Sequence, residues 1–255
     1  MSNTKHVVLI HGAWSRGESW GPARAVFEER GYTVHTPTLR HHELPLHDGA
    51  MKIAPLSMRD YTDDLVALVG LSLGGLLAQL VAARTRHSGV VAACPSPSPG
   101  VFAPTPTTLR SFGSIFASHF LKARPWAEPL YPPTWQRFRR WIANAQTEET
   151  ARELFADLVC ESGRANCELV FPFLDRGKAT TVTFAAVTTP VLAIGGECDR
   201  LITHSVARKT AARYGRGTYV EIPHSDHFVF FGDALPVTMS HIDDWIARNH
   251  VFVTA

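Results

Sequence analysis

The sequence predicts an α/β fold, with a mostly parallel sheet flanked by helices and a helical insertion. Three observations predict it. The chain opens with an apolar run, a segment of helical spacing and a second apolar run, and this succession favours parallel strands connected through helices. Residues 109–180 are rich in aromatic side chains that recur at helical spacing. After residue 190 the short apolar runs return.

The first elements follow from apolar periodicity and from a glycine stop. Residues 5–10 are a short apolar run that predicts a buried strand. Residues 20–30 place apolar side chains at helical spacing, and Gly31 ends that helix. Residues 32–35 predict a second strand. Residues 41–57 contain two prolines and a glycine, so we expect a loop there.

The centre of the chain contains an uncharged stretch, residues 65–83, which is nearly long enough to span a bilayer. We interpret it as a buried strand, a tight turn and a buried helix, because it holds three glycines and the rest of the chain has no membrane features. Residues 61–69 are expected to begin as a helix and end as a strand. Residues 73–86 predict a helix, and residues 89–93 predict another strand.

The two outer parts of the chain are predicted to form one core, residues 1–95 and 187–255, with residues 96–186 inserted between them as a helical cap. A proline-rich passage that begins at residue 94 leads out of the sheet. In the second outer part we expect two strands and two helices, at residues 191–194, 218–222, 204–214 and 237–249.

Composition excludes several classes of protein. The 255 residues are 45% apolar and 19% charged, which is ordinary for a soluble globular protein. The net charge of +2, without a long basic run, argues against a nucleic-acid-binding surface. The 4 cysteines form no CxxC pair and are expected to be free thiols. The first apolar stretch is too short for a signal peptide, which favours a cytoplasmic protein. The sequence leaves the oligomeric state open, and a homodimer is one option.

A candidate nucleophile lies between the central strand and the helix that follows it. Residues 70–74 read Gly-Leu-Ser-Leu-Gly and match the pattern G-x-S-x-G. A serine nucleophile must stand on a sharp turn to expose its hydroxyl, and glycine leaves room on both sides. Ser72 is therefore the candidate, at a helix N-terminus that favours developing negative charge. Taken alone, the pattern also fits an ordinary glycine-rich turn.

A candidate acid and a candidate base lie beyond the two strands expected in the second outer part. Asp199 follows the first strand, and His227 follows the second. Loops at the carboxyl ends of parallel strands meet at one edge of the sheet, so both residues can converge on Ser72. The chain order Ser, Asp, His is typical of enzymes with this motif. Glu197 and His224 are competing candidates, ranked lower because each lies nearer to its strand.

The loop after the first strand reads His11-Gly12-Ala13-Trp14. Enzymes with this layout stabilise the substrate oxyanion with two backbone N–H groups, one from such a loop and one from the residue after the nucleophile. The expected donors are Ala13 and Leu73. We expect His11 to hold the loop and Trp14 to contact the substrate. An ordinary strand-ending turn is the alternative interpretation.

Four segments, VVLIHGAW, GLSLGGLLAQ, PVLAIGGECDRLI and EIPHSDHF, together resemble the α/β-hydrolase superfamily, in its esterase and lipase-like branch. The resemblance covers residues 5–95 and 187–250, and the middle is similar to the variable helical cap that these enzymes insert after their sixth strand. It implies an α/β-hydrolase fold and a serine hydrolase that cleaves carboxylic esters through an acyl-enzyme, with no metal or organic cofactor. The motifs are specific for the fold and poorly specific for the substrate.

Two features depart from that family's pattern. Leu71 stands where many relatives carry histidine. It lies beside the nucleophile but is not one of the three candidate catalytic residues, Ser72, Asp199 and His227. Only residues 57–69 are available before Gly70 for a helix, a connection and a strand. Either that helix is very short, or the sequence lacks a segment there.

The sequence leaves both the substrate and the type of reaction undecided. The aromatic insertion favours a fairly apolar small-molecule ester. The HGAW motif also occurs in plant methylesterase and hydroxynitrile-lyase relatives, so a cofactor-free lyase is one alternative, and a ligand-binding protein without turnover is another. Haloalkane dehalogenases and epoxide hydrolases usually use an aspartate nucleophile, and Ser72 argues against both.

One segment carries several side chains of the types that bind metals: His41, His42, Glu43, His47 and Asp48. Imidazoles and carboxylates are suitable ligands, but their spacing matches no standard helix-borne site. We expect a solvated loop near the rim of the active site and no metal there.

Overall fold

The computed structural model describes residues 5–63, 69–101 and 104–251. Its centre is a six-stranded sheet in which all neighbouring strands run parallel, in the order β2-β1-β3-β4-β5-β6. The strands are β1 (Lys5–Ile10), β2 (Tyr32–His35), β3 (Val69–Leu71), β4 (Val90–Ala93), β5 (Val191–Gly196) and β6 (Gly217–Ile222). The prediction of a parallel α/β sheet is confirmed.

The strand order reverses its direction between β1 and β3. The chain runs outward from β1 to β2 and then returns to the other side of β1 to form β3. In open parallel sheets, ligands bind beyond the carboxyl ends of the strands, at the point where the strand order reverses. Leu71 is the last residue of β3 and pairs with Ala93 of β4, so Ser72 begins at this edge of the sheet.

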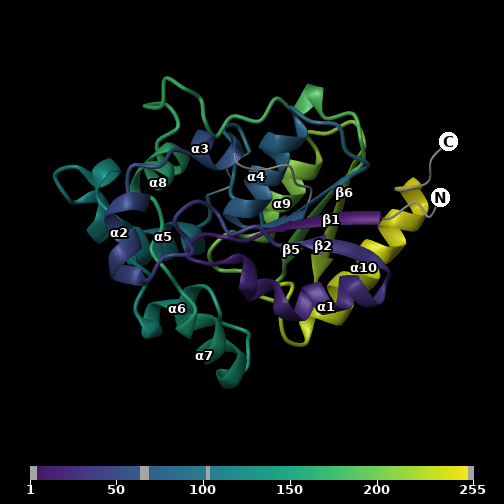
Figure 1. Ribbon diagram of the computed structural model, residues 1–255, viewed down its shortest axis with the longest axis horizontal. Coiled ribbons are helices and arrows are strands. Elements are labelled where there is room, and N and C mark those ends of the chain that lie inside the picture. Colours follow the sequence, from purple (N-terminus) through teal and green to yellow (C-terminus); the bar gives the residue numbers. More distant parts are fainter. Residues whose placement is uncertain (1–4, 64–68, 102–103, 252–255) are drawn as a thin grey trace.

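Helices cover both faces of the sheet (Figure 1). One face carries α1 (Gly21–Glu29) and α10 (Ala234–Asn249), and the other carries α3 (Met58–Asp63), α4 (Leu73–Ala82) and α9 (His204–Ala211). Successive strand residues face opposite layers. Leu9 therefore lies in the same buried cluster as Phe27 of α1. Its neighbour Ile10 lies in the cluster that contains Leu76 of α4. Full burial of such side chains stabilises the fold by roughly 1.5–3 kcal/mol each.

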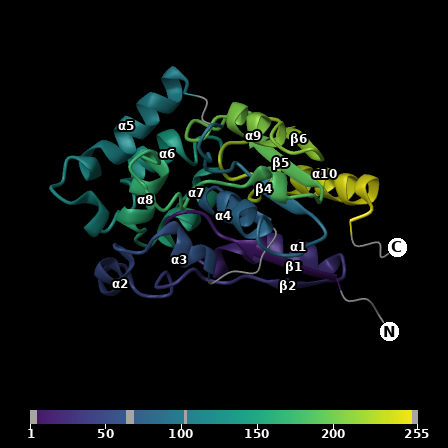
Figure 2. The same ribbon diagram turned by 90° about the horizontal axis from the view of Figure 1, so that it is seen from above.

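The chain between β4 and β5 forms the helices of the predicted insertion: α5 (Pro106–Phe120), α6 (Trp135–Trp141), α7 (Glu148–Ala156) and α8 (Gly163–Val170). Figures 1 and 2 show them gathered at the end of the sheet where β1 finishes. Hydroxyl caps begin three of them, because Thr105, Thr147 and Ser162 each accept a hydrogen bond from the backbone N–H three residues later. The insertion follows the fourth of the six described strands.

Short 3-10 helices complete the described elements, at η1 (Gly17–Trp20), η2 (Pro125–Ala127) and η3 (Phe184–Ala186). The uncharged stretch at residues 65–83 includes β3 and the ten-residue α4. Within the described ranges, no helix combines the length and the apolar character needed to cross a membrane.

The expectation of a loop at residues 41–57 is wrong in part, because α2 (Leu46–Ile53) forms there. Ala50 and Ile53 are buried and pack with Cys160 of the insertion. Pro45 immediately precedes the first turn, where its missing N–H has no intrahelical partner to lose. The proline marked the start of a helix rather than an irregular segment.

The short approach to Gly70 lies partly outside the described residues. α3 ends at Asp63 and β3 begins at Val69, and residues 64–68 are not among those described. The described part of the strand before the candidate nucleophile is three residues long.

Candidate active site

Ser72 stands on a strained turn between β3 and α4. Its φ of 59° and ψ of −116° are rare for a residue with a side chain. The turn is tightly enclosed: a Cβ at Gly70 would collide with the carbonyl oxygen of Gly74, and a Cβ at Gly74 would collide with that of Ile10. Packing therefore requires both glycines of the G-x-S-x-G pattern, and it holds Ser72 at the carboxyl edge of the sheet.

Asp199 and His227 form a buried pair. His227 Nδ1 lies 2.7 Å from Asp199 Oδ2. The other carboxylate oxygen, Asp199 Oδ1, accepts hydrogen bonds from the N–H groups of Leu201 (2.8 Å) and Ile202 (2.9 Å). Because the backbone fixes one oxygen, the other is held in place for His227. A carboxylate at Nδ1 places the proton on that atom and leaves the Nε2 lone pair free to accept a proton.

The environment of His227 acts on its pKa in two directions. Burial, the largest influence, lowers the pKa of His227, whereas the charge and the hydrogen bond of Asp199 raise it. The result is a pKa above the ordinary value of 6.5. The pair therefore favours the protonated imidazole more than water does, which is what an imidazole needs in order to accept a proton during a reaction.

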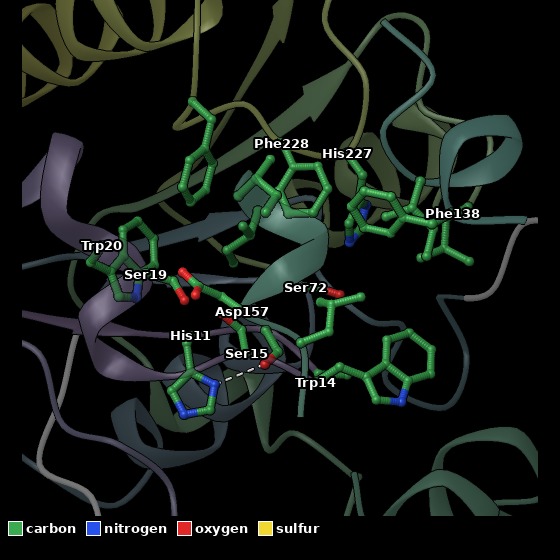
Figure 3. Close-up of a pocket in the computed structure, with 18 residues that line it drawn as sticks. His11, Trp14, Ser15, Ser19, Trp20, Ser72, Phe138, Asp157, His227 and Phe228 are labelled. Carbon is green, nitrogen blue, oxygen red and sulfur yellow. Dashed lines mark hydrogen bonds between the residues drawn. The ribbon is translucent and has the colours of Figure 1, made fainter. Parts of the chain in front are cut away.

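One cavity, called the small cavity, brings Ser72 and His227 together with Ala13 (Figure 3). A Cβ at Gly12 would lie only 3.2 Å from Ser72 Cβ, so the loop after β1 passes directly against the serine. A second space, called the large cavity, is also lined by Ser72 and Ala13, and there Leu73 joins them. Both expected oxyanion donors thus belong to residues that flank Ser72.

Trp14 joins the loop after β1 to the insertion. Its φ is 62°, and its ring N–H donates to the carbonyl oxygen of Leu130 at 3.1 Å. The ring stacks on Phe116 with 5.7 Å between centroids, and the Trp14 carbonyl oxygen accepts from the N–H of Val159 at 2.8 Å. Trp14 lines both the small and the large cavity, and its contact with a substrate stays a prediction.

The His11 side chain fixes the same loop through two hydrogen bonds. Its Nε2 accepts from the N–H of Leu39 at 3.0 Å, so Nδ1 carries the proton and donates to the carbonyl oxygen of Gly12 at 2.8 Å. Burial, followed by the neighbouring His42, lowers the pKa of His11 to about 3. The ring is therefore neutral and structural at ordinary pH.

The five candidate metal ligands of residues 41–48 do not converge. His41 and Glu43 lie near the surface, with 3.9 Å between Nδ1 and Oε1, and His47 and Asp48 belong to α2. His42 instead turns inward and is fully buried. Among the described residues, the candidate metal-binding group includes none of these five.

His42 belongs to a buried network that the sequence did not reveal. Its Nε2 lies 3.2 Å from Glu161 Oε2, and the other oxygen of Glu161 accepts from the Tyr61 hydroxyl at 2.7 Å and from the N–H of Ser162 at 2.6 Å. Burial, the largest influence, raises the pKa of Glu161, but His42 and these hydrogen bonds lower it below the usual 4.5. The network ties the segment before α2 to the insertion, beside the large cavity.

Replacing Glu161 by alanine should destabilise the protein by roughly 1–3 kcal/mol for each buried polar group that loses this acceptor, chiefly the ring of His42 and the hydroxyl of Tyr61. Urea unfolding at pH 7 measures the loss. The pKa of Glu161 is lowered by folding, so its carboxylate stabilises the fold above pH 4.5, and this contribution disappears as the pH falls through the folded pKa. The matched control is Glu153→Ala, an exposed position on α7. Equal losses in the two variants would contradict the prediction.

The competing acid and base pair with each other at the surface. The His224 N–H donates to Glu197 Oε2 at 2.7 Å, and the His224 side chain is 92% exposed. Neither residue is among the described residues that line the small cavity. The geometry therefore favours Asp199 and His227 over this pair.

Asp226, next to His227, is a further buried acid that sequence reasoning overlooked. Its Oδ2 accepts from the N–H groups of Ala145 (2.7 Å) and Gln146 (3.1 Å), and its Oδ1 accepts from the N–H of Phe228 (3.0 Å). Asp226 thus clamps the loop of His227 to the turn between α6 and α7. Its place between two candidate histidines was visible in the sequence, but its partners lie about 80 residues away along the chain.

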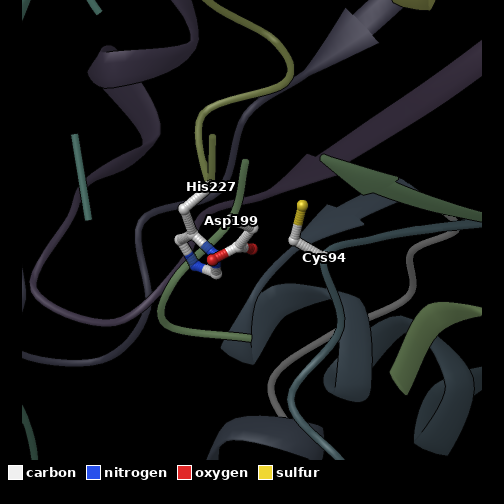
Figure 4. A group of neighbouring side chains, drawn as sticks. All are labelled: Cys94, Asp199 and His227. Carbon is white, nitrogen blue, oxygen red and sulfur yellow. The ribbon is translucent and has the colours of Figure 1, made fainter. Parts of the chain in front are cut away.

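Cys94 lies close to the pair of Asp199 and His227 (Figure 4). Each of the three residues offers a possible metal ligand, and these atoms lie within 4.8 Å of one another. A metal would need a thiolate, whereas burial and then the charge of Asp199 raise the pKa of the Cys94 thiol well above its usual range. The donor set therefore fits a hydrogen-bonded acid and base with a neutral thiol close to them better than it fits a metal centre.

A model of the alpha/beta hydrolase family matches residues 7–237. None of the curated proteins matches the sequence. Among solved structures, a pyrethroid hydrolase from Sphingobium faniae JZ-2 is 19% identical with a TM-score of 0.69, and the match covers 96% of this chain and 98% of that one. An esterase from Thermogutta terrifontis is 17% identical with a TM-score of 0.67, over 96% and 90% of the two chains.

A monoacylglycerol lipase from Paleococcus ferrophilus is also 17% identical, with a TM-score of 0.64 over 96% of each chain. At these identities the likeness establishes the fold. The chemistry depends on the residues of this chain, where a serine on a tight turn shares a cavity with an imidazole that a buried carboxylate orients.

Proposed function

This chain belongs to the alpha/beta hydrolase family, and from that premise we propose that it is a serine hydrolase that cleaves carboxylic esters through an acyl-enzyme intermediate. The observation that carries the proposal is the buried pair of Asp199 and His227, 2.7 Å apart, beside the strained turn of Ser72. This combination supplies a nucleophile, a base and a group that orients the base.

In the first half of the proposed reaction, the Ser72 hydroxyl attacks the ester carbonyl carbon while His227 Nε2 takes its proton. Asp199 holds the proton on Nδ1 and stabilises the positive charge that forms on the ring. The backbone N–H groups of Ala13 and Leu73 donate hydrogen bonds to the carbonyl oxygen as it becomes negatively charged. His227 then gives its proton to the departing alcohol, and the acyl group remains on Ser72.

In the second half, a water molecule takes the place of the alcohol. His227 removes a proton from that water as it attacks the acyl carbon, and the same two N–H groups hold the oxyanion again. Ser72 leaves with the proton from His227, and the carboxylic acid is released. Every proton transfer passes through one imidazole, so the proposal needs no group beyond these residues and water.

Treatment with a fluorophosphonate tests the proposal without a guess about the substrate, because the reagent marks only activated serines. Intact mass and peptide mapping should find a single adduct on Ser72. The Ser72→Ala variant should give none, and Ser205→Ala should react as the wild type does, since Ser205 on α9 lines neither cavity. A folded protein without an adduct, or an adduct on another residue, would reject the nucleophile.

A further inference from the structure

Two cavities of unequal size meet at Ser72. The small cavity has a volume of about 50 Å³ and the large cavity about 450 Å³. Both are lined by Ser72, Ala13, Trp14 and Leu201. An ester bound at Ser72 therefore has two unequal spaces for its two halves, and the chemistry of the site decides which half enters which space.

His227 lines the small cavity, and Leu73 lines the large one (Figure 3). The proton on His227 must pass to the oxygen of the alcohol as the ester breaks, so the alcohol lies on the side of the imidazole. The carbonyl oxygen turns toward the N–H groups of Ala13 and Leu73. Since the alcohol lies toward His227 and the carbonyl oxygen lies toward the two N–H groups, the acyl chain extends into the large cavity.

The two cavities differ in size, whereas the walls of both are mainly apolar. Leu109 of α5, with Leu169 and Val170 of α8, contributes apolar surface to the large cavity. A volume of about 450 Å³ is within the range of cavities that hold small organic ligands. The small cavity has room for only a few non-hydrogen atoms, and aromatic side chains such as Trp20, Phe138 and Phe231 line it. Its size therefore limits the group that it can hold.

We propose that the preferred substrates are esters of a bulky, apolar carboxylic acid with a small alcohol, such as methanol or ethanol. This inference rests on the proposed function, since it assigns the two halves of the ester from the position of His227. The acyl group occupies the large cavity formed mainly by the insertion, and the alcohol leaves through the small cavity.

Two isomeric esters test the assignment at constant size and composition. Methyl 4-phenylbutanoate carries its bulk on the acyl side, and 3-phenylpropyl acetate carries it on the alcohol side. We expect kcat/KM to be at least about tenfold higher for the methyl ester, a difference of about 1.4 kcal/mol. Equal or faster hydrolysis of the acetate would overturn this inference and leave the proposed function standing. Hydrolysis of neither isomer by a protein that forms the fluorophosphonate adduct on Ser72 would overturn this inference alone, and the additional absence of that adduct would overturn both.

A substitution in the large cavity gives a second, independent measurement. Val170→Phe should lower the ratio of kcat/KM for methyl 4-phenylbutanoate to that for methyl acetate by at least about fivefold, because only the larger acyl group needs the filled space. The matched control, Val237→Phe on the exposed side of α10, should leave that ratio unchanged. An unchanged ratio in a folded Val170→Phe variant would place the acyl group elsewhere and overturn the assignment.

Discussion

Replacing Ser72 by alanine should lower kcat for ester hydrolysis by roughly 10⁴- to 10⁶-fold, because it removes the hydroxyl that we propose to form the acyl-enzyme. The remaining activity would come from the oxyanion donors and from binding alone. The fold should be unaffected. Alanine and serine both have a Cβ, so the strain at a φ of 59° is the same for each. Initial rates with methyl 4-phenylbutanoate and urea unfolding measure the two quantities.

The control for this variant is Ser205→Ala, whose hydroxyl bonds only locally, to Thr203 at 2.9 Å. Its kcat should stay within about twofold of the wild type. Rates for Ser72→Ala that stay close to the wild type would reject Ser72 as the nucleophile. Because the unfolding measurement is separate, a loss of rate with a normal unfolding free energy assigns the effect to chemistry.

The sheet could be predicted because each strand is marked by residues that are close together in the sequence. Buried parallel strands are short runs of apolar residues, and each of the six observed strands begins or ends near such a run. The turn at Ser72 was predictable because the spacing of Gly70 and Gly74 around the serine is a local pattern, although the contact that requires Gly74 is with Ile10 of β1. Asp199 and His227 were chosen from the positions of strand ends, and the structure places the two side chains in contact.

The features that the sequence did not predict depend on contacts between segments far apart in the chain. His42 and Glu161 are separated by 119 residues, and nothing in the local sequence of either one indicates that they meet. α2 was missed because Pro45 and Gly49 suggested a loop, whereas burial of Ala50 and Ile53 against the insertion favours a helix. Tertiary packing overrides local preference at such places.

Asp226 and Glu161 each connect the insertion to the sheet-bearing part of the chain through hydrogen bonds. Asp226 holds the turn between α6 and α7 against the loop of His227, and Glu161 holds the start of α8 against His42 and Tyr61. Glu161 itself lines the large cavity, whereas α6 and α7, which Asp226 helps to hold, contribute Phe138 and Leu154 to the small cavity. A change in either carboxylate should alter substrate range together with stability, because the same contacts serve both.

Replacing Asp199 by asparagine should lower kcat/KM by roughly 10³- to 10⁴-fold with little change in the fold. The amide has the same shape as the carboxylate, and one of its atoms can still accept from Leu201 and Ile202. Its N–H₂ group would then face His227 Nδ1 and donate to it. The imidazole proton would move to Nε2, the atom that must accept the proton of Ser72.

The pH dependence of this reaction separates a role in orientation from a purely structural one. His227 must be neutral to act as a base, and its pKa in the wild type is raised above 6.5, so kcat/KM should fall as the pH drops through a midpoint above 6.5. Asp199→Asn removes the charge that raises this pKa, and the midpoint should move to lower pH. Glu197→Gln, at the competing acid, should change neither the rate nor the midpoint. If Glu197→Gln had the larger effect, the surface pair of Glu197 and His224 would have to replace Asp199 and His227 in the reaction.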